Sequence, residues 1–163
     1  MAQESLAFTN LLRVLAEYGE AIRNEYQDNL IRSNRIASGD LLNNVEFEVV
    51  QDGMRFLVNL HVRKYWEYIE NGTRPHLPPV SALLTWIETK PVLPRPDDNG
   101  RLPTPLQLAF AIRNKIGKEG TKGSEDLHKA SVSISEQYRE KIEEAFRMDM
   151  EEGMHAMVIE FFK

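Results

Sequence analysis

Three acidic residues and one lysine are the side chains of this sequence whose spacing suggests catalysis. Glu88-Thr89-Lys90 matches the Glu-x-Lys half of a metal-dependent nuclease site, and either Glu67 or Glu70 could supply the second carboxylate. In such a site both acids converge on Mg²⁺, and the lysine polarises the attacking water. Glu-x-Lys of this kind normally lies on a strand, whereas here it ends a helix predicted to open at Pro78. The pattern favours a solvated helix end whose lysine complements the helix dipole, and the nuclease stays a minor alternative.

The remaining candidates for site chemistry are histidines and cysteines. Glu151 and His155 would share a helix face at i,i+4, which is common on surfaces. The four histidines are His61, His76, His128 and His155, and no two of them have a spacing typical of metal ligands. The chain has no cysteine, which excludes a thiol nucleophile, a disulfide framework and thiolate metal sites. We therefore expect no metal site.

The glycines do not predict a phosphate-binding loop. The segment 117–123 contains three glycines but lacks the preceding strand and the Gly-Lys-Ser/Thr ending of a P-loop. There is no Gly-x-Ser-x-Gly elbow, so acyl transfer has no candidate nucleophile. The sequence predicts a protein that is not an enzyme and that binds no cofactor.

Composition and charge narrow the class of protein further. The 163 residues are 42% hydrophobic and 28% charged, the ordinary balance of one globular domain. No apolar run is long enough to cross a bilayer, and Met1–Ser5 has no basic segment typical of a secretory signal. We expect no membrane association. The net charge of −5 argues against a dedicated nucleic-acid binder, although residues 85–130 hold 8 basic and 6 acidic groups.

Hydrophobic periodicity predicts an α+β fold with a long helix at each end. A helix from about Glu4 to Ser33 is followed by an antiparallel hairpin over 45–62, whose turn lies at Gln51-Asp52-Gly53. A helix from about Ser131 to the end completes the chain. The spacing of three and four along the first helix is set by Phe8, Leu11, Leu12, Leu15, Tyr18, Ile22, Tyr26 and Leu30.

The centre of the chain is predicted to hold shorter elements. Residues 63–72 are aromatic-rich and fit either a short helix or a third strand. Helices follow over Pro78–Lys90 and Thr104–Gly117, separated by a proline-rich loop at 91–105. Residues 117–126 are expected to be flexible because of their glycines. The whole chain, 1–163, is predicted to be one domain, with flanking helical segments 1–34 and 131–163 around a core over 35–130.

An ordered series of short motifs runs through this core. The motifs are Ser38-Gly39-Asp40-Leu41-Leu42-Asn43-Asn44, Tyr65-x-x-Tyr68-Ile69-Glu70-x-Gly72-Thr73-Arg74-Pro75, Pro78-Pro79-Val80, Trp86-Ile87-x-x-Lys90, Leu108-Ala109-Phe110-x-Ile112-x-x-x-Ile116 and Gly120-Thr121-x-Gly123. In this order they resemble the tail-completion family of tailed bacteriophages, which comprises neck or minor tail components that join head and tail. The long proline-rich loop and the long last helix depart from the commonest pattern of the family.

The resemblance implies a non-enzymatic α+β structural protein of the virion that assembles in the host cytoplasm. Members form rings, commonly of six or twelve copies. The implied partners are further copies of the chain, the portal or connector, and the tail tube or terminator proteins. A related alternative is a tail-terminator ring that caps the tube.

Two sets of residues are candidates for contacts in such an assembly. The interface candidates are Tyr65, Glu70, Gly72, Arg74, Met154 and Phe161. A basic cluster is predicted either to face DNA in a ring lumen without sequence preference or to be a solvated face, and it consists of Arg113, Lys115, Lys118 and Lys122. The last apolar stretch, Met154 to Phe161, is the part of the final helix that we expect to contact a neighbouring subunit.

Overall fold

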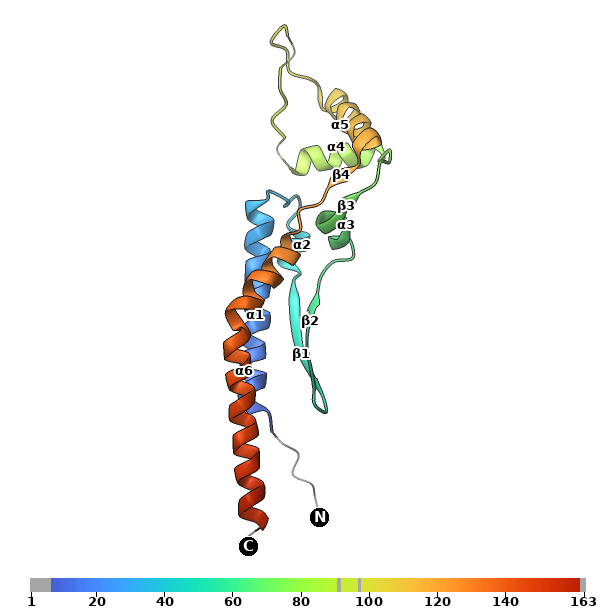
Figure 1. The fold of residues 1–163 in the computed structure, drawn as a ribbon. Helices are drawn as coiled ribbons and strands as arrows, with labels where there is room; N and C mark the ends of the chain where they lie inside the picture. The colour runs from blue at the N-terminus through green and yellow to red at the C-terminus, as the bar shows by residue number, and fades with distance from the viewer. Residues whose placement is uncertain (1–6, 91, 97, 162–163) are drawn as a thin grey trace. The chain divides into compact units, whose positions relative to one another are not determined.

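The computed structural model describes residues 7–90, 92–96 and 98–161, without the side chains of Glu160 and Phe161. The fold is α+β, as predicted, with a long helix near each end and an antiparallel hairpin after the first (Figure 1). Its elements are α1 (Thr9–Arg32), α2 (Asp40–Asn43), β1 (Glu46–Asp52), β2 (Arg55–His61), α3 (Trp66–Asn71), β3 (Gly72–Thr73), α4 (Val80–Thr89), α5 (Pro105–Glu119), β4 (Thr121–Lys122) and α6 (Asp126–Phe161).

The chain divides into two compact units. Unit 1 holds the described parts of Met1–Asp28, Val45–His61 and His128–Lys163, and unit 2 holds those of Asn29–Asn44 and Val62–Leu127. Each unit therefore combines segments that are distant in sequence. The single domain predicted over 1–163 stays a prediction.

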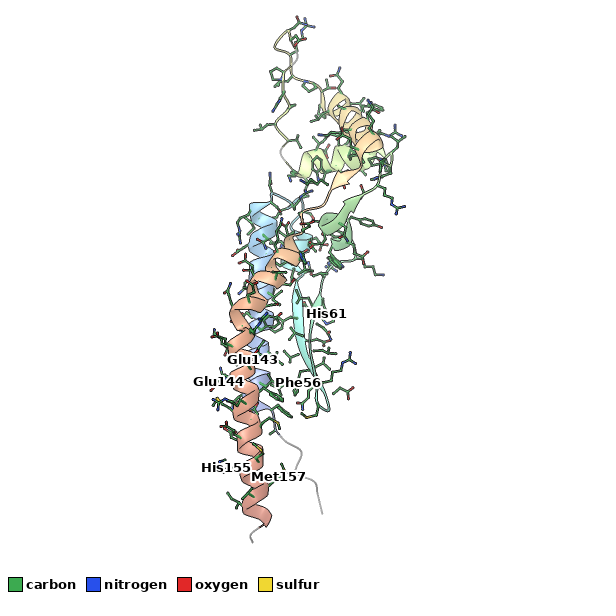
Figure 2. The ribbon with its side chains drawn as sticks, in the orientation of Figure 1. Phe56, His61, Glu143, Glu144, His155 and Met157 are labelled. Atoms are coloured by element: carbon green, nitrogen blue, oxygen red, sulfur yellow. The ribbon has the colours of Figure 1, made fainter. Side chains whose placement is uncertain are left out.

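Unit 1 is built from α1, α6 and the β1–β2 hairpin, which lie side by side (Figure 1). Its core contains Phe8, Leu11 and Leu15, and Phe56 of the hairpin packs against these residues. The Phe8 ring meets Phe56 edge-on at 4.9 Å between centroids and stacks on Phe146 of α6 at 5.9 Å. Figure 2 labels Phe56 where the hairpin lies beside α1 and α6. The predicted apolar stripe of the first helix thus forms the core of this unit.

The hairpin confirms the predicted period of two. Its register pairs Glu46 with His61 at one end and Asp52 with Arg55 at the other. The turn is one residue later than predicted, at Gly53-Met54, because Asp52 still belongs to β1. On α1, a Cβ built on buried Gly19 would lie 2.5 Å from the Phe47 ring, so this glycine allows the close approach of the strand to the helix.

In unit 2, α4 and α5 pack against each other, with Leu83 and Ala109 buried. Thr104 caps α5, and its hydroxyl accepts from the backbone N–H of Gln107 at 3.3 Å, while the Gln107 side chain accepts from the Thr104 N–H at 2.9 Å. This reciprocal pair satisfies two amides at the start of the helix. The described residues between α4 and α5 form no helix or strand, as the prolines predict.

Three predicted boundaries were wrong. Helix α1 begins at Thr9, not Glu4, and residues 4–6 lie outside the described part of the chain. Helix α5 continues through Gly117 to Glu119, and α6 begins at Asp126 instead of Ser131. The segment after α5 contains β4 and buried Ser124, and the flexibility expected for 117–126 stays a prediction. Of the two alternatives for 63–72, the structure has mainly the helix, since α3 spans Trp66–Asn71.

Candidate assembly surfaces

The two glycine motifs that carry the family resemblance meet in one place, where β3 pairs with β4. Gly72 lies opposite Lys122 in this short antiparallel pair, and Thr73 lies opposite Thr121. The two threonine hydroxyls are 2.9 Å apart and hydrogen bonded. Segments separated by about fifty residues of sequence are therefore joined at this point, which we call the glycine crossing and define as Gly72, Gly120 and Gly123.

Each glycine of the crossing is required by the closeness of the opposite backbone. A Cβ on Gly72 would lie 2.1 Å from the Thr121 carbonyl oxygen, and one on Gly120 would lie 2.0 Å from that of Thr73. A Cβ on Gly123 would lie 2.2 Å from the Glu70 carbonyl oxygen. Gly72 and Gly120 also have φ of 76° and 73° with ψ of −168° and −157°, a region that is essentially restricted to glycine.

Glu70 lies inside the subunit beside this crossing. Only 6% of the residue is exposed, and its carboxylate accepts the Leu127 backbone N–H at 3.0 Å, in the first turn of α6. Its carbonyl accepts the Glu125 N–H at 3.2 Å. An acid at a helix N-terminus satisfies an amide without an intrahelical partner and complements the dipole. Glu70 and Gly72, both predicted at an interface, thus have structural contacts within unit 2.

Tyr65 and Arg74 are the more accessible members of the predicted interface. The Tyr65 hydroxyl donates to the Asp40 carboxylate at 3.3 Å. Partial burial, and then the nearby Asp40 charge, raise the pKa of Tyr65 above its ordinary value. Arg74 is exposed, and its carbonyl oxygen lies 2.9 Å from Nδ1 of His76. Both residues remain available to a neighbour.

The Glu-x-Lys motif lies at the end of α4. Glu88 is exposed in the helix, and the Lys90 amine donates to the Asn34 carbonyl. Burial, and then the nearby Arg35 cation, lower the pKa of Lys90. Glu70, one of the two partner acids considered for a nuclease, is engaged with α6. Among the residues that the structure describes, no group of three His, Asp or Glu side chains could hold a metal ion.

Lys90 also borders a cavity of about 320 Å³ in unit 2. Its apolar wall includes Leu30, Leu41 and Trp86, and Asp40 and Tyr65 contribute polar groups. The Lys90 ammonium lies 5.8 Å from the Trp86 ring centroid, within the range of a cation–π contact.

The four cations of the predicted basic cluster do not share one face. Arg113 and Lys115 are two positions apart on α5, which places them on nearly opposite sides of the helix. The Arg113 Nε donates to the Pro78 carbonyl at 3.1 Å. Lys115 and Lys122 instead line one hollow of about 420 Å³ beside β4. The structure thus brings together two of the four residues at this hollow.

The last predicted surface lies on the distal part of α6. Met154, Met157 and Val158 are 52%, 56% and 54% exposed. Figure 2 shows Met157 and His155 on this part of the helix. Phe161 ends α6, and its side chain lies outside the described residues.

Sequence reasoning missed Asp149, which fixes the start of α1. Its carboxylate accepts the Asn10 N–H at 3.0 Å, the Asn10 side-chain amide at 2.9 Å and the Leu11 N–H at 2.8 Å. Asp149 is 1% exposed. The available signal was an acid on the apolar face of the last helix, three positions after Phe146. Buried Asp126 instead accepts the hydroxyl of Ser33, just after the end of α1, at 2.7 Å.

Comparison of the chain with protein-family models, curated proteins and solved structures finds no match. Within the described ranges, no helix combines the length and apolar character needed to span a bilayer.

Proposed function

We propose that this chain is a structural protein of a tailed-bacteriophage virion. It forms a ring in the neck, where it completes the tail and connects it to the portal. The observation that carries the proposal is the presence of large exposed apolar side chains in both units. One set is Met154, Met157, Val158 and Ile159, and the other is Leu77, Leu93, Leu102, Leu106 and Phe110.

Two different apolar surfaces on one subunit are what a ring requires. A head-to-tail interface joins unlike surfaces, and it closes into a ring when the rotation between subunits allows. Scattered single apolar residues are ordinary on a monomer, but neighbouring ones mark interaction sites. Leu106 and Phe110 are four apart on α5, as are Met154 and Val158 on α6, so each pair shares a helix face.

The residues behind the family resemblance support a structural role. The segment Glu70–Pro75 and the Gly120-Thr121-x-Gly123 motif meet at the glycine crossing, where their contacts are backbone packing and helix capping. These contacts are structural, because they cap the first turn of α6 and allow close backbone packing. The nuclease alternative has no comparable support, since Glu88 and Lys90 lie at a helix end.

A nonsense mutation in the gene for this chain, within the phage that carries it, tests the proposal. We expect filled heads and finished but detached tails in electron micrographs of the lysate, with normal virions restored in a suppressor host. Tails of uncontrolled length would instead identify the chain as the tail terminator. Intact infectious virions in the nonsense mutant would contradict both structural roles.

A further inference from the structure

The distal part of α6 carries an apolar stripe that continues past the core of unit 1. Met150 packs against that core, and Met154, Met157 and Val158 continue the same face at helical spacing. Asp149, the cap of α1, marks where α1 begins beside α6. Unbranched methionine side chains adapt to an irregular surface, which suits them to an interface.

The surface of α6 around and before this part is acidic. Its exposed acids are Glu143 and Glu144, before Met150, and Glu151 and Glu152, after it. Arg147 is the one Lys or Arg between Glu143 and Phe161, and it is paired with Glu144 at 2.6 Å and with Glu151 at 2.7 Å. Two copies of this surface placed together would bring acid against acid. Charge therefore opposes a symmetric contact and favours a cationic receptor.

A cationic receptor with an apolar floor is present in unit 2. The hollow of about 420 Å³ between α5 and β4 has the half-buried Ile112 and Ile116 four positions apart, with Lys115 and Lys122 beside them. Among the described residues, no carboxylate forms an ion pair with either lysine amine. Glu119 is the one acid of the lining. We call this hollow the α5–β4 hollow.

We propose that the distal α6 segment of one copy docks into the α5–β4 hollow of the next copy. Met154 and Val158 contact the two isoleucines, and Glu151, which shares their side of α6, meets Lys115 and Lys122. An apolar helix face in a hydrophobic groove is a recurrent way to recognise a helix. The contact joins unlike surfaces, so it repeats from copy to copy and builds the ring. This inference rests on the proposed function and names the contact by which that ring forms.

Charge reversal on each surface tests the docking. We expect E151K and K115E/K122E each to raise the dissociation constant of assembly by about 100-fold or more, because like charges then face each other. An equal mixture of the two variants, or all three changes in one chain, restores complementary charges and should return assembly to within about 10-fold of wild type. Sedimentation velocity measures assembly, and circular dichroism checks the fold.

The matched control is E136K/E140K, which reverses two exposed acids nearer the start of α6 and should assemble like wild type. If a reversal unfolds the chain, the neutral variants E151Q and K115Q/K122Q replace it, with the same ranking expected. The docking would be overturned if either charge-reversal variant assembled like wild type, or if mixing the two variants failed to restore assembly. It would also be overturned if the wild-type chain stayed monomeric.

A further arm separates docking from DNA binding at the same lysines. We expect K115E/K122E to lose assembly. If the variant instead assembles like wild type but no longer binds a short DNA duplex that the wild-type chain binds, the docking is overturned and the two lysines are assigned to nucleic-acid binding. Failure of the proposed function is distinguishable. If the charge-reversal variants restore each other's assembly in solution but the nonsense mutant still yields infectious virions, the docking contact is supported and the proposed role in the neck is contradicted.

Discussion

Replacing Gly72 by alanine is expected to lower the free energy of unfolding by about 3 kcal/mol or more. The added Cβ would lie 2.1 Å from the Thr121 carbonyl oxygen, and this neighbour is backbone that cannot rotate away. The conformation of Gly72 alone costs about 1–3 kcal/mol for a residue with a side chain. Urea unfolding followed by circular dichroism measures the loss.

Gly100 is the matched control for this substitution. It has a similar φ of 75°, but nothing lies within 4 Å of the position that its Cβ would occupy. Gly100→Ala should therefore cost about 1 kcal/mol, the conformational part alone. Equal effects at both positions would show that the backbone at the glycine crossing is looser than the contacts of Gly72 indicate.

Replacing Asp149 by alanine is expected to have the second large effect, a loss of about 3 kcal/mol. The change removes the acceptor of two backbone amides, those of Asn10 and Leu11, and a buried amide without a partner costs about 1–3 kcal/mol. The N-terminal turn of α1 should fray, which would expose Phe8 of the core.

Denaturant unfolding and amide hydrogen exchange of Asn10 and Leu11 test this role of Asp149. Glu152→Ala, an exposed change on the same helix, should stay within about 0.5 kcal/mol of wild type. A stability of Asp149→Ala as close to wild type as that of the control would be inconsistent with the capping role.

The local spacing of apolar residues was sufficient to predict the elements that bury one continuous face. The stripe from Phe8 to Leu30 predicts α1 because its apolar residues, apart from the adjacent Leu11 and Leu12, follow one another at steps of three or four. The alternation of apolar and polar residues from Val45 to Val62 predicts the hairpin, because every second side chain of a strand lies on the same face. Each pattern is visible within the residues that form the element itself.

The boundaries that were missed depend on partners far away in the sequence. Glu70 caps α6 through Leu127, and Asp149 caps α1 from the other end of the chain. Glycines in 117–123 predicted flexibility, since glycine is permissive by itself. At the glycine crossing, the same residue type also allows close backbone contact, and this second use depends on the pairing of β3 with β4, which the local sequence does not indicate.

The candidate site was predictable in part. The distal part of α6 was predicted as an interface because it follows Gly153 and lies far in sequence from the hairpin, and the structure leaves its methionines exposed. Lys115 and Lys122 were grouped with Arg113 because they are close in sequence, but helix geometry separates Arg113 from them and β4 brings Lys122 near Lys115. Glu70 and Gly72 were predicted at an interface because they belong to the same motif as Arg74. The sequence alone did not show that their contacts lie inside the subunit.

The central claim is that this chain is an assembly subunit, and native mass spectrometry of the purified chain tests it most directly. We predict a closed species of one fixed copy number, with a mass that is a whole multiple of the 18.8 kDa subunit. The species should persist on dilution until it dissociates to monomer without open-ended intermediates. A monomer alone at the highest soluble concentration would contradict the claim.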